Sequence, residues 1–251
     1  MMAPVLGIDI GGTGLKAALV DTENGKMVTP RRRVLTPQPA RPAAVCAAIA
    51  ALVAAEEFAG ATRAGAGFPG VIKGGVAFTA ANLGGAWVGK DVASLLGEAI
   101  AKPVSVANDA DVAGLAEVRF GAGQGHGGEI LMVTLGTGIG CGFFHNGMLI
   151  PNTELGHIEI NGKDAEQTAA ALVRERKKLS WKRWARDVEA YLQKLEALIW
   201  PDLIIIGGGV SATPEKFLPL ITTRTKVVPA TLGNEAGIIG AALWAAEQER
   251  G

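Results

Sequence analysis

Short apolar runs that end in glycine bends recur along the chain. The run from Val5 to Ile10 is followed by "GGTG", and a second run, from Leu15 to Val20, is closed by the turn "DTENG". This pattern predicts two strands joined by a glycine bend. The stretch "ILMVTLGTGIGCGFFHNGMLI", residues 130–150, repeats the order of strand, glycine bend and strand, and "HNG" closes it as "ENG" closes the first copy. Two similar halves indicate a duplicated architecture.

Helical periodicity and turn residues fill the segments around these hairpins. In the first half they predict a strand at 28–35, a helix at 43–58, a strand, turn and strand within 63–80, a helix at 91–100 and a buried strand running straight into a helix within 103–121. In the second half they predict helices at 164–178 and 180–199, a strand at 203–207 and a closing helix at 234–249. We expect a small N-terminal α/β domain over 1–108 and a large α/β domain over 109–234, with the C-terminal helix, 235–251, packed back on the first.

Composition and charge narrow the class of protein. The chain has 251 residues, 49% of them hydrophobic, and 35 glycines, which is typical of a globular α/β protein rich in tight turns. Its 24 basic and 24 acidic residues cancel, so no nucleic-acid or membrane partner is expected.

The cysteines and the N-terminus indicate a cytoplasmic protein. Cys46 and Cys141 have neither metal-site nor disulfide spacing. The first apolar stretch carries Asp9 and lacks the basic start of a secretory signal. A reducing compartment therefore fits best.

Two glycine bends are candidates for phosphate binding. Glycines let backbone amides approach a phosphate closely, and a nearby hydroxyl and lysine add a donor and a charge. The residues concerned are Gly11, Gly12, Thr13 and Lys16 in the first bend and Gly136, Thr137 and Gly138 in the second. The alternative is an ordinary tight turn, but two copies favour phosphate. Asp9, at the end of the first strand, is expected to bind a phosphate-bound Mg²⁺ through water.

Three further glycine-rich stretches have to be judged by their context. "IIIGGGV" places Gly207, Gly208 and Gly209 where they could approach an adenosine or form only a strand-end turn. "GGAWVGKD" resembles a P-loop with aspartate in the magnesium position, but no apolar run precedes it. "GAGFPG" satisfies the dinucleotide pattern, yet a turn and a strand follow instead of a helix. We expect neither a P-loop nor a Rossmann site.

Acidic side chains at the strand-to-helix junction "VSVANDADVAG" are candidates for proton transfer. Asp109 lies where the helix dipole favours a carboxylate that can take a proton. The competing interpretation is structural, because Asn108 is a good N-cap and Asp109 and Asp111 are ordinary first-turn acids. Spacing alone leaves these alternatives open.

Two other stretches carry polar groups that suit a substrate. In "NTELGHIEINGKDAEQ", Glu154 and His157 offer acceptor and donor groups to a polar substrate, although Glu154 can also be solvated and His157 a core residue. The segment "RERKKLSWKRWAR" is strongly basic: it contains Arg174, Arg176, Lys177, Lys178, Lys182, Arg183 and Arg186. Such a run is either a solvated helix face or a stripe that attracts a linear polyanion in a salt-sensitive way. Trp181 and Trp184 are expected to turn inward.

The order of motifs resembles the ROK family of sugar kinases, which have the duplicated, two-domain actin/hexokinase-like (ribonuclease H-like) fold. The motifs are "DIGGT", "GFPG", "AND", "GTGIG", "ELGH" and "IIGGG", and they cover nearly the whole chain. Within the family, "TAANLGGAW", "LSWKRWA" and "PDLIIIGGGVS" are most similar to the polyphosphate glucokinase branch.

The resemblance implies a role for each candidate residue. Asp109 becomes the catalytic base, and the sugar contacts are Asn82, Asn108, Glu154, His157 and Glu166. Trp87 would either form a wall of the sugar pocket or pack in the core. The family usually carries a cysteine-rich zinc motif after the Gly-His pair, whereas no cysteine lies beyond Cys141 here. We therefore expect no zinc.

These features predict a homodimeric glucokinase that binds glucose in a cleft between its domains. It would transfer the terminal phosphoryl group of polyphosphate, ATP or both to the 6-hydroxyl group of glucose, with Mg²⁺ as cofactor. Polyphosphate would contact Arg174, Lys177, Lys178, Lys182 and Arg183. The alternatives are an ATP-only kinase for mannose, fructose or an N-acetylhexosamine, a sugar-responsive repressor, and an actin-like nucleotide-binding protein. The repressor would need a DNA-binding module ahead of Asp9, for which we expect no room.

Overall fold

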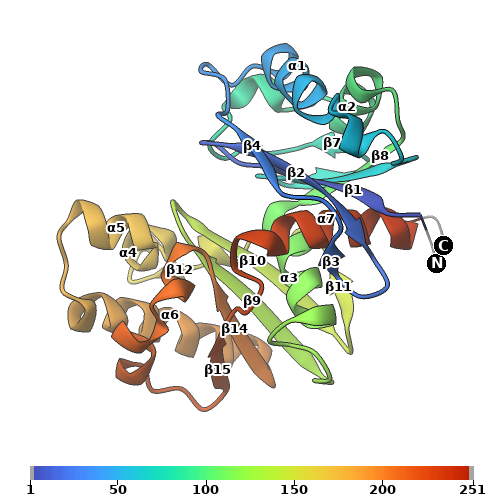
Figure 1. The fold of residues 1–251 in the computed structure, drawn as a ribbon. Coiled ribbons are helices and arrows are strands. Elements are labelled where there is room, and N and C mark those ends of the chain that lie inside the picture. Colours follow the sequence, from blue (N-terminus) through green and yellow to red (C-terminus); the bar gives the residue numbers. More distant parts are fainter. Residues whose placement is uncertain (1–2, 249–251) are drawn as a thin grey trace. The chain divides into compact units, whose positions relative to one another are not determined.

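The computed structural model describes residues 3–248 (Figure 1). The chain forms two compact units: the first takes the chain up to Ala116 and again from Glu235, and the second runs from Glu117 to Asn234. The division lies later than position 108 because helix α3 (Asp109–Phe120) continues from the first unit into the second. No helix within residues 3–248 is both long and apolar enough to cross a bilayer.

The first unit is built on a six-stranded sheet. Strand β1 (Val5–Ile10) pairs antiparallel with β2 (Leu15–Asp21) and parallel with β5 (Ala64–Phe68), and β8 (Val104–Asn108) extends the parallel side. The short strands β3 (Lys26–Met27) and β4 (Arg32–Val34) pair with β2, and β6 (Ile72–Lys73) and β7 (Val76–Ala77) form a separate hairpin. The carboxyl ends of parallel strands meet at one edge of a sheet, so β1 and β8 bring Asp9 and Asn108 to the same edge.

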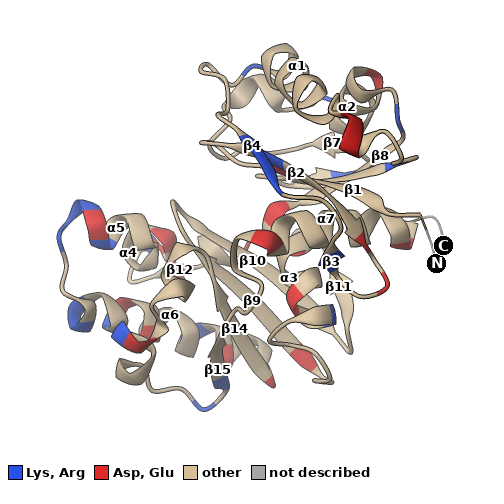
Figure 2. Cartoon of the chain, in the orientation of Figure 1, with Lys and Arg blue, Asp and Glu red and all other residues tan. Residues whose placement is uncertain are grey.

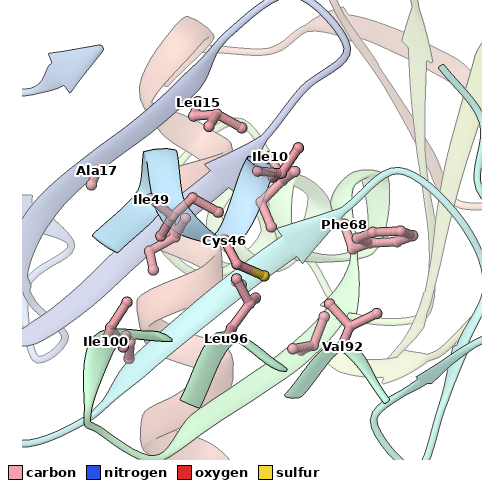
Figure 3. Close-up of a cluster of buried hydrophobic side chains, with 14 of the residues drawn as sticks. Ile10, Leu15, Ala17, Cys46, Ile49, Phe68, Val92, Leu96 and Ile100 are labelled. Atoms are coloured by element: carbon pink, nitrogen blue, oxygen red, sulfur yellow. The ribbon is translucent and has the colours of Figure 1, made fainter. Parts of the chain in front are cut away.

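Helices cover both faces of this sheet (Figure 1). Helices α1 (Pro42–Val53) and α2 (Val92–Ile100) pack together on one face, and α7 (Ala236–Gln248) packs on β1, β5 and β8 on the other. Figure 3 shows part of the core, where Cys46 and Ile49 of α1 and Leu96 of α2 gather near Ile10 and Phe68. Burial of these apolar side chains stabilises the unit.

Glycines let α7 lie close to the sheet. A Cβ atom built on Gly7 or Gly65 would overlap a backbone carbonyl oxygen of α7, and one built on Gly240 of α7 would overlap the Val112 carbonyl oxygen of α3. Gly7 and Gly65 are therefore required by the packing of α7 on the strands, and Gly240 by the packing of α7 on α3. No local sequence pattern predicts this use of glycine, because the contact joins segments far apart in the chain.

The second unit repeats the hairpin and its parallel neighbour. Strands β9 (Glu129–Leu135) and β10 (Ile139–His145) are antiparallel, β14 (Leu203–Gly207) runs parallel to β9, and β11 (Met148–Ile150) and β15 (Lys226–Pro229) form the edges. Strands β12 (Glu159–Ile160) and β13 (Lys163–Asp164) form a small hairpin. Helix α6 (Trp181–Ile199) buries one apolar face in the core of this unit. The repeated order of strands confirms the duplicated α/β architecture.

Several predicted elements differ in extent from the structure. The strand expected at 28–35 shrinks to β4, because Pro30 cannot donate to a ladder. The helix expected at 43–58 ends at Val53 and is followed by one 3-10 turn, Glu56–Phe58. The helix expected at 164–178 splits into α4 (Glu166–Ala169) and α5 (Ala171–Arg176), because Ala170 is extended, with φ −62° and ψ 146°. The short edge strand β15 was missed.

A buried carboxylate links the two ends of the second unit by hydrogen bonds. Glu117, near the end of α3, is 0% exposed. It accepts hydrogen bonds from the backbone amides of Ala122 at 2.9 Å, Thr231 at 3.1 Å and Leu232 at 2.7 Å, and from the Thr231 hydroxyl at 3.2 Å. A carboxylate shared by this many donors is a charge-assisted network.

Replacing Glu117 with glutamine is expected to lower the free energy of unfolding by about 1–3 kcal/mol. The amide offers one acceptor oxygen instead of two, and its NH₂ group faces N–H donors. Urea denaturation measures the change. The matched control is Glu215→Gln, at an exposed position, which should alter stability by less than about 0.5 kcal/mol. Equal stability of the two variants would contradict the role given to Glu117.

Candidate active site

The first glycine bend, residues 11–14, joins β1 to β2 and presents backbone amides that can bind an anion. Gly11 donates to the Gly14 carbonyl at 3.0 Å. The carbonyls of the bend are in turn held by side chains, namely those of Thr36, Gln38 and Arg33. Among the described residues, the amides of Gly12 and Thr13 have no acceptor. Backbone amides arranged in this way are suited to bind an anion.

Beside this bend, Asp9 pairs with Lys16 across the hairpin. The distance from Lys16 Nζ to Asp9 Oδ2 is 2.6 Å, and the two side chains are 23% and 17% exposed, respectively. Within residues 3–248 no group of three or more His, Cys, Asp or Glu side chains gathers to hold a metal. A single partly exposed carboxylate fits Mg²⁺, which is commonly bound by one or two carboxylates together with substrate phosphates and waters.

The second glycine bend, residues 136–138, has the same backbone arrangement as the first. Gly136 donates to the Gly138 carbonyl at 3.0 Å, and the amides of Thr137 and Gly138 have no acceptor within the described part of the chain. The Glu166 carboxylate lies against this bend, where it accepts from the Ile139 amide at 3.4 Å. A Cβ atom on Gly138 would come within 2.6 Å of Glu166 Oε2. The structure therefore places Glu166 beside a candidate phosphate site.

A pocket of about 430 Å³ opens beside the second bend. It is lined by the bend, α5, the first residue of α6 and the 3-10 turn η4 (Gly209–Ala212); the residues include Gly136, Thr137, Arg174, Trp181, Gly209 and Thr213. Of the predicted adenosine-binding glycines, Gly209 lines this pocket. Cβ atoms on Gly207 and Gly208 would instead overlap Met132 and the Leu135 carbonyl, respectively. Gly207 and Gly208 are therefore explained by close packing, and Gly209 alone of the three lines the pocket.

Asp109 is the first residue of α3, directly after β8. Asn108 is 8% exposed, and its side-chain oxygen accepts from the amides of Ala110 at 2.8 Å and Asp111 at 3.2 Å, while its side-chain nitrogen donates to the Gly70 carbonyl at 3.2 Å. Asn108 is therefore an N-cap, as the structural interpretation predicted. The half-buried Asp109 carboxylate lies at the positive end of the helix dipole, which favours its ionised form.

Glu154, His157 and Asp164 form a polar cluster in the second unit. His157 Nε2 lies 3.7 Å from Glu154 Oε2, and His157 Nδ1 lies 3.5 Å from Asp164 Oδ2. The exposed fractions are 52% for His157, 39% for Glu154 and 40% for Asp164, so His157 is not a core residue. Asp164 was not predicted from the sequence, and the hairpin of β12 and β13 brings it to the histidine.

The loop that contains Asn82 packs against the first glycine bend. Asn82 has a positive φ of 63° and is exposed, and a Cβ atom on Gly12 would lie 2.8 Å from the Asn82 Cβ atom. Trp87, in the same loop, is 0% exposed, donates to the Ala40 carbonyl at 2.8 Å and packs edge-on against Phe68. Trp87 is therefore a core residue of this unit.

The two rejected nucleotide motifs have ordinary structural roles. In the P-loop-like stretch, the 3-10 turn η2 (Gly85–Trp87) follows a loop, and Asp91 is the N-cap of α2, where its side chain accepts from the Ser94 amide at 3.0 Å. Hydrogen bonds from the backbone and side chain of Ser94 lower the pKa of Asp91. The dinucleotide-like stretch, residues 65–70, continues into the hairpin of β6 and β7. Neither stretch therefore has the strand-to-helix context that its motif requires.

The basic segment, residues 174–186, spans the end of α5 and the start of α6, where Figure 2 shows a concentration of Lys and Arg. Its members differ in their partners. Arg183 pairs with Asp187 at 2.7 Å, and the guanidinium carbon of Arg174 lies 3.8 Å from the Trp181 ring centroid. Lys177, Lys178 and Lys182 are exposed. Trp184 is fully buried, as predicted, and Trp181 is half-buried.

Comparison with known proteins places this site in context. Residues 5–173 match the ROK family. The chain is 46% identical over 238 residues to the polyphosphate glucokinase of Mycobacterium tuberculosis (strain H37Rv), an alignment that covers 94% of this chain and 89% of the relative.

Two solved structures are also similar. The inorganic polyphosphate/ATP-glucomannokinase from Arthrobacter sp. strain KM matches with a TM-score of 0.94 and 48% identity and covers 98% of this chain and 100% of that chain. The ROK family glucokinase from Streptomyces griseus, solved in complex with glucose and AMPPNP, matches with a TM-score of 0.81 and 26% identity and covers 95% and 98% of the two chains.

Proposed function

Because this chain belongs to the ROK family, we propose that it is a glucokinase that transfers the terminal phosphoryl group of inorganic polyphosphate, and of ATP, to the 6-hydroxyl group of glucose. The observation that carries this proposal is the 46% identity to a polyphosphate glucokinase over 94% of the chain. The two glycine bends, each with two amides that lack acceptors within the described part of the chain, supply phosphate-binding groups of the kind that such a reaction needs.

In the proposed mechanism Asp109 is the general base. Its carboxylate takes the proton of the 6-hydroxyl group while that oxygen forms a bond to the terminal phosphorus, and the bond from phosphorus to the rest of the donor breaks. The shortened polyphosphate or ADP then leaves. The amides of the two bends bind phosphate oxygens. Mg²⁺, held by Asp9 and the donor phosphates, would neutralise part of the charge on the migrating group.

We assign Asn82, Asn108, Glu154, His157 and Glu166 to the sugar hydroxyls, where they would act as mixed donors and acceptors. Asp164 is added as a positioning residue, because its carboxylate faces His157 Nδ1.

We also propose that the enzyme is a cytoplasmic homodimer that binds neither zinc nor nucleic acid. Location is supported by the spacing of Cys46 and Cys141, which form no disulfide among the described residues and suit a reducing compartment. No cysteine follows Cys141 to form the zinc motif of the wider family.

The direct test is formation of glucose 6-phosphate with polyphosphate and with ATP, measured side by side. Mannose, fructose and N-acetylglucosamine serve as rival acceptors. The proposal expects turnover of glucose with polyphosphate. Absence of glucose phosphorylation with both donors would refute a glucokinase, and turnover with ATP alone would refute the polyphosphate donor.

Polyphosphate-driven activity is expected to be more sensitive to salt than ATP-driven activity. A long polyanion bound by several cations releases counterions, so raising the salt concentration from about 50 to about 200 mM should reduce kcat/KM for polyphosphate by at least about tenfold, and for ATP much less. Initial rates in a sodium chloride series measure this difference. Equal salt dependence of the two donors would indicate that the basic segment is only a solvated face.

A further inference from the structure

We propose that Arg174, held face-on against Trp181, is the residue that gives the donor pocket its preference for polyphosphate over ATP. This inference rests on the proposed kinase function and names one determinant of donor choice. It separates Arg174 from the rest of the basic segment, residues 174–186, which lies largely on the surface.

Trp181 gives Arg174 a rigid support. The Trp181 ring stacks on Phe217, with centroids 6.2 Å apart and an interplanar angle of 20°, and meets Trp184 edge-on at 5.7 Å. Phe217 and Trp184 are both 0% exposed. A guanidinium group on such a platform loses little side-chain entropy when it binds a ligand, because its position is already fixed.

The hydrogen-bonding state of Arg174 indicates a missing acceptor. Its Nε atom is buried and has no hydrogen-bond partner among residues 3–248, and its Nη1 atom makes a long contact of 3.5 Å to the Leu179 carbonyl. Within the described residues Arg174 forms no ion pair. A buried donor of a charged group is costly to leave unpaired. Arg174 also lines the pocket that reaches the second glycine bend.

The planar arrangement of the guanidinium donors favours a phosphate chain over a purine base. The N–H groups of guanidinium lie in its plane and match phosphate oxygens, whereas a base stacked on its face would leave Nε unpaired. One face of the guanidinium is already covered by Trp181. A polyphosphate chain presents oxygens along its whole length, so it can satisfy Arg174 while its end lies at the glycine bend. The exposed Lys177, Lys178 and Lys182 would then contact more distant phosphates.

The test is Arg174→Ala, assayed with both donors at saturating glucose. We expect kcat/KM for polyphosphate to fall by at least about tenfold, as for loss of one charge-assisted hydrogen bond, and kcat/KM for ATP to change by less than about threefold. The slope of log kcat/KM against log salt for polyphosphate should become shallower by about one. Arg174→Lys keeps the charge but not the planar donors, and it should show an intermediate loss.

Arg186→Ala is the matched control, because Arg186 is an exposed cation of the same segment that does not line the pocket. It should change polyphosphate turnover by less than about threefold. Activity of the Arg174 variants with ATP reports that they are folded. Equal losses with both donors, or an unchanged rate with polyphosphate, would overturn the inference. A wild-type enzyme without polyphosphate turnover would refute the proposed donor before any variant is made, so the two failures are distinguishable.

Discussion

Replacing Asp109 with asparagine is expected to lower kcat for glucose phosphorylation by about 10²- to 10⁴-fold with either donor, the range typical of a lost general base. Asparagine has nearly the same size and can still accept the hydrogen bond that the Ala110 amide gives to Asp109 Oδ1 at 2.8 Å. It cannot take a proton from the sugar hydroxyl. Steady-state rates of glucose 6-phosphate formation measure the loss.

Asp91→Asn, in the same unit, is a control that distinguishes loss of catalysis from loss of folding. Asp91 is also an aspartate at a helix N-terminus, where its side chain caps α2. Asparagine is an equally good N-cap, so Asp91→Asn should not disturb the fold. Because Asp91 has no proposed role in the reaction, kcat should stay within about twofold of wild type. Should Asp109→Asn retain wild-type turnover while it is folded, Asp109 is not the base, and the structural interpretation of a first-turn acid would stand.

Replacing Gly65 with alanine is expected to reduce the free energy of unfolding by at least about 3 kcal/mol, at the upper end of overpacking effects. Gly65 lies in β5, and an added Cβ atom would overlap the Ala241 carbonyl oxygen of α7. The added Cβ atom is fixed to the backbone of β5, and the oxygen belongs to the backbone of α7, so no flexible side chain can move aside. Helix α7 would have to move away from the sheet and lose apolar contacts. Chemical denaturation measures the stability.

Gly60→Ala is the control for this substitution. Gly60 is exposed, and a Cβ atom there would meet no atom within 4 Å. This exchange should be neutral or stabilising by up to about 1 kcal/mol, because alanine reduces the entropy of the unfolded chain. If Gly65→Ala were as stable as Gly60→Ala, the close packing of α7 on β5 would not be needed for stability.

Some residues of the candidate site could be placed from the sequence, and others could not. The glycine bends and the junction at Asn108 and Asp109 could be predicted because their signals are local. The position of Glu166 could not, because it lies beside Ile139, far along the chain. Trp87 had two interpretations, and only its complete burial against Phe68 decided between them.

The sequence by itself determined the duplicated hairpins, the strand-to-helix junction that presents Asp109, and the absence of P-loop and Rossmann contexts. Each depends on turn residues and apolar periodicity within a short stretch, where local backbone preferences dominate. The tertiary structure alone decided which groups meet across long separations. Glu117 binds the amides of Thr231 and Leu232, Gly65 admits α7, and a break at Ala170 separates α4 from α5, the helix that carries Arg174 over Trp181. Such pairs depend on how sheets and helices pack, which no local pattern specifies.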